Sequence, residues 1–382
     1  MKAGWELKPL GAVCVFDKLQ GLHKNLPYIG LEHIESHTAQ FTGSTDPVTV
    51  KSATFRFTSQ HVLYGRLRPY LNKVLAPDFE GHCSTEIFPI KPKPELSREY
   101  LLYWLLADET VEKINATCTG ARMPRADMNE VLSFQFPLPP LPEQHRIVAI
   151  LDAAFDGIAT AKANAEQNLQ NARALFESHL QQVFTKRGKG WVEKRLGDVC
   201  AITSTLVDPR KKEFLDLTHV GAGNIESQTG AFVELKTARE EGLISGKFLF
   251  DESMVLYSKI RPYLMKVARP NFRGLCSADM YPLAPLPNVI TRDYLFHLLL
   301  SKPFTNYAIE GSARAGMPKV NREHLFEFRV CLPNIDKQAE LSAKLDALHE
   351  ETQRLESLYR QKHAALEELK KSLLHQAFSG QL

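Results

Sequence analysis

One segment of this sequence occurs twice, and the repeat limits the possible architecture more than any other feature. Residues 63–84 (LYGRLRPYLNKVLAPDFEGHCS) recur 193 positions later as residues 256–277 (LYSKIRPYLMKVARPNFRGLCS), and 13 of the 22 positions are identical. The flanks repeat as well, since LGAVC corresponds to LGDVC and a Met-Pro pair follows in both copies. The chain is therefore predicted to be a tandem duplication of one folding unit.

Each copy is followed by a long run with apolar residues at alternating spacings of four and three, the heptad pattern of helices that pack lengthwise. The first run covers about residues 142–184, and the second ends the chain. At about 1.5 Å per residue, each helix would reach roughly 60 Å, longer than one globular core requires. We expect the alanine-rich first seam to pack on the leucine-rich second seam as an intramolecular coiled coil, in preference to two unrelated surface helices. The predicted seam includes Leu151, Ile158, Ala165, Ala172, Leu175, His179, Leu345, Leu348, Leu355, Leu366 and Leu369.

Outside these helices, each copy has the pattern of a mixed α and β domain. Short alternating or β-branched runs at 53–58, 61–67 and 254–260 predict strands, whereas 98–114 and 292–309 predict helices with one apolar face. The expected fold is therefore α+β: a tandem duplication of a small α/β domain followed by a long helix, with the two helices pairing as an antiparallel coiled coil with pseudo-twofold symmetry. The predicted domains are residues 1–137, 138–187, 188–331 and 332–382, of which the second and fourth are helical.

Composition excludes several classes of protein. With 382 residues, of which 44% are hydrophobic, the chain can build more than one core. No apolar run is long enough for a membrane span, and no signal or transit pattern is present. The six cysteines are scattered without a CxxC motif, so we expect free thiols and a cytoplasmic location. The formal net charge of +3 neither requires nor excludes nucleic-acid binding.

The usual motifs of an enzyme are missing. NLPY at residues 25–28 lacks the second proline of an adenine methyltransferase motif, and neither a glycine-rich cofactor loop nor GxxxxGK[ST] occurs. Asp78 and Glu86 suggest a metal-dependent nuclease, but Phe88 stands where such a site needs lysine, and the second copy has Asn271 in place of Asp78. We therefore interpret these acids as exposed loop residues. We expect no catalytic residue, no metal site and no cofactor held by this chain itself.

The repeated segment carries basic residues beside aromatic ones. If its strand ends at the Arg-Pro turn in each copy, several cations leave one edge together and can bind phosphates or guanine edges. The candidate DNA-binding residues are Arg66, Arg68, Lys73, Arg122, Arg125, Lys259, Arg261, Lys266, Arg314 and Lys319. Tyr70 and Tyr263, beside the prolines, are interpreted as core packing in preference to base stacking. The alternative interpretation of the basic residues is an ordinary solvated strand face.

The paired RPYL segments, LPPLPEQHRIVAILD at 138–152 and LLHQAFSGQL at 373–382 resemble the specificity subunit of type I restriction–modification systems, and the resemblance covers essentially the whole chain. It implies a non-catalytic DNA-reading subunit. The domains at 1–137 and 188–331 would be target recognition domains, each reading one half of a bipartite site. The two helices would set the spacer between the half-sites.

The resemblance also implies partners. These are double-stranded DNA, two copies of a modification subunit that carries S-adenosylmethionine and methylates a flipped-out adenine, and a restriction subunit that uses ATP and Mg; no membrane is involved. The two helices would also dock the two modification subunits. The second helix opens with LPNIDKQ where the first has LPPLPEQ, so Lys337 stands in place of Glu143 and the two docking surfaces need not be equally strong. The alternative function is a coiled-coil scaffold that joins two protein-binding domains and binds no DNA.

Overall fold

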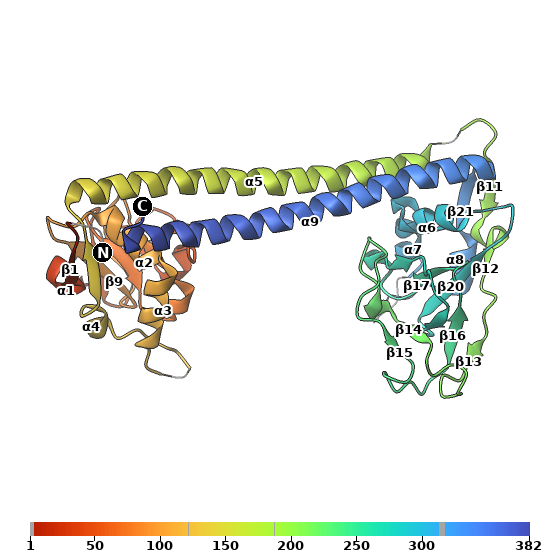
Figure 1. Cartoon of the computed structure of the whole chain (residues 1–382), viewed down its shortest axis with the longest axis horizontal. Coiled ribbons are helices and arrows are strands. Elements are labelled where there is room, and N and C mark those ends of the chain that lie inside the picture. The colour runs from red at the N-terminus through yellow and green to blue at the C-terminus, as the bar shows by residue number, and fades with distance from the viewer. Residues whose placement is uncertain (1–3, 121, 187, 313–317) are drawn as a thin grey trace. The chain divides into compact units, whose positions relative to one another are not determined.

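The computed structural model describes residues 4–120, 122–186, 188–312 and 318–382. The chain divides into two compact units. Unit 1 contains the chain up to Glu166 together with Tyr359–Leu382, and unit 2 contains Gln167–Leu358. Each unit holds one copy of the repeat and a stretch of both long helices (Figure 1). Among the helices in the described ranges, none is long and apolar enough to cross a membrane.

The described strands of unit 1 form three small sheets. The first has the order β2 (Cys14–Phe16), β9 (Ile87–Pro92), β6 (Val62–Gly65) and β7 (Val74–Leu75). The second has the order β3 (Gln20–Gly21), β5 (Thr54–Phe57), β8 (Gly81–Cys83) and β4 (Tyr28–Ile29), and the third pairs β1 (Glu6–Pro9) with β10 (Gln135–Leu138). All pairs are antiparallel except β4 with β8. The strands predicted at 53–58 and 61–67 are β5 and β6.

Unit 2 repeats this topology and adds one strand. Its first sheet has the order β12 (Cys200–Ala201), β20 (Met280–Pro285), β17 (Val255–Ser258) and β18 (Val267–Ala268). The second has the order β13 (Leu206–Val207), β16 (Lys247–Phe250), β19 (Gly274–Cys276), β14 (Thr218–Val220) and the additional β15 (Lys236–Thr237), and the third pairs β11 (Val192–Arg195) with β21 (Arg329–Leu332). The parallel pair is again the equivalent one, β14 with β19. The predicted tandem duplication is confirmed.

The short helices follow the same repeat. In unit 1 they are α1 (Leu10–Val13), α2 (Arg98–Leu106), α3 (Asp108–Ala116) and α4 (Met128–Val131), and in unit 2 they are α6 (Arg292–Leu300), α7 (Lys302–Glu310) and α8 (Arg322–Glu327). The 3₁₀ turns are η1 (Leu31–His33), η2 (Pro69–Leu71), η3 (Leu196–Asp198), η4 (Ala222–Asn224) and η5 (Pro262–Leu264).

The single helices predicted at 98–114 and 292–309 are wrong, because each is two helices. The chain turns extended at Ala107 (ψ 132°) between α2 and α3, and at Ser301 (ψ 148°) between α6 and α7. Ser301 caps the new helix, since its side chain accepts a hydrogen bond from the backbone N–H of Phe304. The apolar residues of α2 and α6 are also buried around most of the helix rather than on one face, because both helices lie within the core.

The two long helices are α5 (Leu141–Thr185) and α9 (Ile335–Ser379). In unit 1, Arg146 reaches the carbonyl of Leu382, and sixteen residues further along α5 Lys162 pairs with Glu367, so the helices run antiparallel there. In unit 2, Arg173 Nε lies 2.6 Å from Glu356 Oε1. The arrangement is consistent with the predicted coiled coil.

Most predicted seam residues on these helices are buried or half-buried. Leu151, Ile158, Ala165 and Leu345 are at most 6% exposed, and Ala172, Leu348, Leu355 and Leu366 are half-buried. The predictions for Leu175, which is 56% exposed, Leu369, which is 47% exposed, and the exposed His179 are wrong. Because an α-helix has 3.6 residues per turn, the positions of a strict heptad repeat rotate around the helix by about 20° per heptad. After several heptads they no longer face the partner helix. Phe176 and Leu180, each one position later than predicted, pack there instead.

Gln144 attaches the start of α5 to the globular part of unit 1. Its side chain is buried, and Oε1 accepts a hydrogen bond from the backbone N–H of Ser97 at 2.8 Å. Its Nε2 donates to the carbonyl oxygens of Glu95 at 2.9 Å and Pro139 at 2.8 Å, so both N–H donors are used. Because Ser97 caps α2, one amide joins the beginnings of two helices.

Gln338 makes the same attachment for α9 in unit 2. Its Oε1 accepts from the backbone N–H of Thr291 at 2.9 Å, and Nε2 donates to the carbonyls of Val289 at 3.0 Å and Pro333 at 2.9 Å. Thr291 caps α6 as Ser97 caps α2. The difference between LPPLPEQ and LPNIDKQ therefore leaves the attaching glutamine unchanged.

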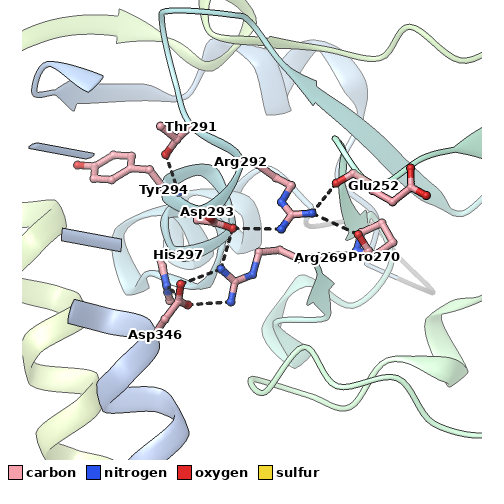
Figure 2. Close-up of polar contacts among 9 residues, drawn as sticks. All are labelled: Glu252, Arg269, Pro270, Thr291, Arg292, Asp293, Tyr294, His297 and Asp346. Atoms are coloured by element: carbon pink, nitrogen blue, oxygen red, sulfur yellow. Dashed lines mark hydrogen bonds and ion pairs between the residues drawn. The ribbon is translucent and has the colours of Figure 1, made fainter. Parts of the chain in front are cut away.

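A polar cluster adds a second attachment between α9 and α6 (Figure 2). Arg269 lies between two carboxylates, with Nη1 2.8 Å from Asp293 Oδ1 and Nη2 2.7 Å from Asp346 Oδ1. The fully buried His297 has its Nε2 2.8 Å from the same Asp346 oxygen. Burial lowers the pKa of His297 more than Asp346 raises it. Burial raises the pKa of Asp346, but its hydrogen bonds with His297 and Arg269 outweigh burial and hold that pKa well below the usual range.

The first prediction concerns the glutamine attachment. Replacing Gln144 with Ala leaves the buried N–H of Ser97, the buried carbonyl of Pro139 and the part-buried carbonyl of Glu95 without this partner. Each buried group left unpaired costs about 1–3 kcal/mol. We expect the free energy of unfolding of unit 1 to fall by about 3 kcal/mol or more, measured by urea denaturation. The control is Gln60→Ala, which changes an exposed glutamine of unit 1 and should alter this free energy by less than about 0.5 kcal/mol. Equally small effects of both changes would contradict the attachment.

The second prediction concerns pH. Because the pKa of His297 in the folded chain lies below its ordinary value of 6.5, the unfolded chain takes up a proton more readily as the pH falls below about 6.5. Unit 2 should therefore lose up to about 1.4 kcal/mol of stability per pH unit between roughly pH 6.5 and 5. His297→Gln, which keeps an N–H for Asp346, should flatten this dependence in denaturation curves. Burial also lowers the pKa values of His219 and His349. Both histidines are present in the natural chain and in the variant, so the difference between the two slopes reports on His297. An unchanged slope would show that His297 does not titrate there.

Candidate nucleic-acid interface

An arginine in an unfavourable backbone conformation begins the Arg-Pro-Tyr turn in both units. Arg68 has φ 52° and ψ 62°, and Arg261 has φ 49° and ψ 62°, in the left-handed region. For a residue with a Cβ this conformation costs about 1–2 kcal/mol. The backbone N–H of Arg68 donates to the carbonyl of Pro124 at 2.8 Å, and that of Arg261 donates to Pro318 at 2.9 Å. Both copies keep this strained backbone conformation. Strained residues of this kind are concentrated at functional sites, where the backbone fixes the direction of a side chain.

The turn directs an arginine and a tyrosine outward in each unit. Arg68 and Arg261 are exposed, and their side chains form no ion pair with any residue in the described ranges. Tyr70 is 47% exposed and Tyr263 is 51% exposed, so their interpretation as core packing is wrong. The preceding proline fills the core instead. Since neighbouring residues of a 3₁₀ turn point about 120° apart, burial of the proline turns the tyrosine to the surface.

In unit 1, the loop that contains Met123 and Pro124 returns beside the turn and brings Arg125 close to Arg66. The backbone N–H of Ala126 donates to the carbonyl of Arg66 at 2.9 Å. Glu86 lies between the two arginines, with Arg66 Nε 3.1 Å from Oε2 and Arg125 Nη2 2.9 Å from Oε1. Partial burial raises the pKa of Glu86, but the hydrogen bonds and charges of Arg125 and Arg66 outweigh it and lower that pKa below its usual value. Two cations share one carboxylate, so the cluster keeps a net positive charge.

Unit 2 builds the same cluster from different residues. Asp279 Oδ1 lies 3.6 Å from Lys259 Nζ and 3.5 Å from Lys319 Nζ. Lys259 also lies 5.3 Å from the centroid of the Tyr281 ring and donates to the carbonyl of Ala278. Burial and the charge of Lys319 lower the pKa of Lys259 more than Asp279 raises it. The position of the carboxylate between two cations is therefore a shared feature, although the cations are arginines in one unit and lysines in the other.

Lys73 and Lys266 do not belong to this surface. Lys73 Nζ donates to the backbone carbonyls of Leu31 and Ile34, each at 2.7 Å, and Lys266 Nζ donates to that of Ala222 at 2.6 Å. Both side chains are half-buried. Their ammonium groups hold the 3₁₀ turns η1 and η4 in place, so we remove them from the predicted interface.

The remaining candidates divide into two groups. Arg122 is exposed in the Met-Pro loop and makes no ion pair among the described residues, whereas Arg314 lies outside the described residues. The acids Glu86 and Asp279 were missed, because Glu86 was interpreted as an exposed loop acid, yet its side chain is only 23% exposed. The signal was available in the repeat, since this position is acidic in both copies while Asp78 changes to Asn271. In the parts of the chain that the structure describes, no group of His, Cys, Asp and Glu could hold a metal ion.

Each unit thus places an exposed arginine, an exposed tyrosine and a carboxylate-bound pair of cations at one turn and the loop beside it. Arginine and lysine at such an edge suit the phosphates of a nucleic acid, and arginine also suits the guanine edge in the major groove.

Comparison with known proteins agrees with this chemistry. The sequence matches the type I restriction modification DNA specificity domain over residues 16–171 and again over residues 188–364. It is 29% identical over 323 residues to the type I restriction enzyme EcoDI specificity subunit of Escherichia coli, a match that covers 76% of this chain and 71% of that one.

The fold is similar to two solved structures. One comes from a study of complex assembly and conformational transition of the type I R-M system, with a TM-score of 0.79, 21% identity and coverage of 100% of this chain and 99% of that one. The other is the HsdS subunit from Thermoanaerobacter tengcongensis, with a TM-score of 0.67, 21% identity and coverage of 100% and 98%. The two family matches each contain one Arg-Pro-Tyr turn, and together they span most of the sequence. The chain therefore belongs to the type I restriction modification DNA specificity family.

Proposed function

We propose that this chain is the non-catalytic subunit that reads DNA for a type I restriction–modification enzyme in the cytoplasm. Each unit binds one half of a bipartite site, and the paired helices set the spacer between the halves. The observation that carries the proposal is the Arg-Pro-Tyr turn. A strained, exposed arginine that makes no ion pair with the residues the structure describes, and an exposed tyrosine, recur at the same place in both units. A pair of matching readers is what a site in two halves requires.

The proposal assigns different tasks to the cations. Arg68, Arg122 and Arg261 are exposed and make no ion pair among the described residues, which suits them to phosphates. The pairs bound by Glu86 and Asp279 are held in place and suit contacts that need a defined direction. Phosphate contacts position the protein on the duplex, while contacts to base edges carry the sequence information.

The proposal also includes the partners. Two modification subunits dock on the helical region, one near the start of each long helix, and a restriction subunit completes the complex. S-adenosylmethionine, ATP and Mg are held by those partners, and this chain holds no cofactor of its own. The start of α5 carries an ion pair between Glu143 and Arg146 at 2.7 Å, whereas the start of α9 pairs Lys337 with Glu340 at 2.7 Å. The opposite order of charges supports two docking surfaces of unequal strength.

The third prediction tests the turn. In the complex with the modification subunit, Arg68→Ala should lower the affinity for cognate DNA about tenfold. It should also reduce the slope of log affinity against log salt concentration by about 1, the value for one phosphate contact. Arg261→Ala should do the same, measured by fluorescence anisotropy at several salt concentrations. The control is Arg329→Ala, which removes an exposed arginine of β21 that is paired with Glu193. Unchanged binding by both turn variants would remove the turn from the interface.

The fourth prediction tests the spacer. Inserting one heptad into α5 after Glu166 and one into α9 before Tyr359 lengthens each helix by about 10 Å. At about 3.4 Å per base pair, the spacer should grow by about three base pairs. The measurement is genome-wide adenine methylation in cells that express the chain with its modification subunit. An unaltered spacer would contradict the role of the helices, and a soluble complex that methylates no bipartite motif would favour the scaffold.

A further inference from the structure

We propose that Arg66 reads a guanine in the half-site of unit 1, and that Glu86 is the residue that positions it. This inference rests on the proposed function and deepens it, because it assigns one base to one side chain. It also predicts that unit 2 reads no base by the same means.

The guanidinium of Arg66 is fixed on two sides. Its Nε donates to Glu86 Oε2 at 3.1 Å, and its central carbon lies 5.1 Å from the centroid of the Phe88 ring. Glu86 is itself held, because Arg125 Nε lies 3.0 Å from Oε1 and 3.1 Å from Oε2. The carboxylate therefore cannot follow Arg66 into solvent without breaking its contacts with Arg125. The arginine is oriented before any DNA arrives, so less side-chain entropy is lost on binding.

Glu86 occupies the Nε of Arg66 and leaves the edge formed by Nη1 and Nη2, which is the edge that suits guanine. Its Nη1 and Nη2 make no hydrogen bond with any residue in the described ranges, and the side chain is 33% exposed. Two parallel N–H groups match the O6 and N7 acceptors of guanine, the commonest base-specific contact of arginine. Arg125 is used differently, since its Nη1 donates to the carbonyl of Met123 at 3.4 Å and its other nitrogens face Glu86. Arg125 therefore holds the loop and the acid, and Arg66 is left to read.

Unit 2 has no such fork. Lys259 occupies the position of Arg66, and its side chain is only 13% exposed. Its ammonium is turned toward Asp279 and the carbonyl of Ala278, and an ammonium is a point charge rather than a planar pair of donors. The duplicated site thus keeps its carboxylate but loses the bidentate reader. The two units should therefore differ in the bases that they specify.

The negative charge of Glu86 should have opposite effects on two measurable quantities, the affinity for DNA and the discrimination between bases. Its charge repels phosphates, so Glu86 lowers affinity for DNA of any sequence. In return it orients Arg66, which raises discrimination between the right and the wrong base. Removing the charge should therefore change affinity and discrimination in opposite directions. A residue needed only for folding would lower both.

The experiment uses the complex of this chain with its modification subunit and duplexes that carry the methylated motif. Each guanine of the half-sites is replaced in turn by 7-deazaguanine, which lacks the N7 acceptor. With the natural chain, one position in one half-site should weaken binding about tenfold or more. Arg66→Met, which keeps an apolar stem but removes the N–H donors, should bind both DNAs equally at that position and keep its response at every other guanine. The matched control is Lys259→Met, which should leave the response at that guanine intact.

Glu86→Gln is the second variant. It should bind unrelated DNA more tightly and lose most of the discrimination at the same guanine, while Glu86→Asp should recover part of it. The inference is overturned if Arg66→Met responds to 7-deazaguanine as the natural chain does, or if neither half-site contains a G·C pair. It is also overturned if Glu86→Gln lowers affinity for all DNA in proportion. A natural complex without preference for any bipartite site would instead overturn the proposed function, and the inference with it.

Discussion

The buried amides of Gln144 and Gln338 are the contacts on which the rest of each unit depends. Apolar packing draws a long helix onto a globular domain but has little direction. Each amide meets one backbone N–H and two carbonyls, and these three groups belong to the cap of a core helix and to the segments beside it. This geometry sets the direction in which each long helix leaves its own domain.

The two units share their backbone topology, whereas several of their side-chain contacts differ. The sheets of the two units match in strand order and in the one parallel pair, yet the second attachment of the long helix has changed. In unit 1, Tyr103 donates a hydrogen bond to Asp152. In unit 2, His297 takes that place against Asp346, and Arg269 joins them. The same geometric task is thus performed by a phenol in one unit and by a histidine whose protonation weakens the fold in the other.

The turn and the loop beside it combine strain, charge and exposure. The left-handed arginine costs energy in each unit, and the surrounding hydrogen bonds to the Met-Pro loop keep it in place. Acidic residues at the same surface pair with cations and reduce its positive charge. Two lysines of the repeat serve the fold instead, because backbone carbonyls already occupy their ammonium groups.

The sequence alone determined the duplication, the two long helices, the class of fold and the family, because repeats and periodic apolar positions survive without coordinates. It also placed the turn at Arg68-Pro69 and Arg261-Pro262. It did not determine which face of the turn is buried, since Tyr70 and Pro69 are both apolar enough for a core and only the 3₁₀ geometry decides between them. It likewise treated Arg66, Arg68 and Lys73 as equals. Only the tertiary structure distinguished them. In the folded chain Arg66 meets a carboxylate, Arg68 is exposed, and Lys73 donates to two backbone carbonyls. These surroundings come from residues distant in the chain, and they decide the role of each cation.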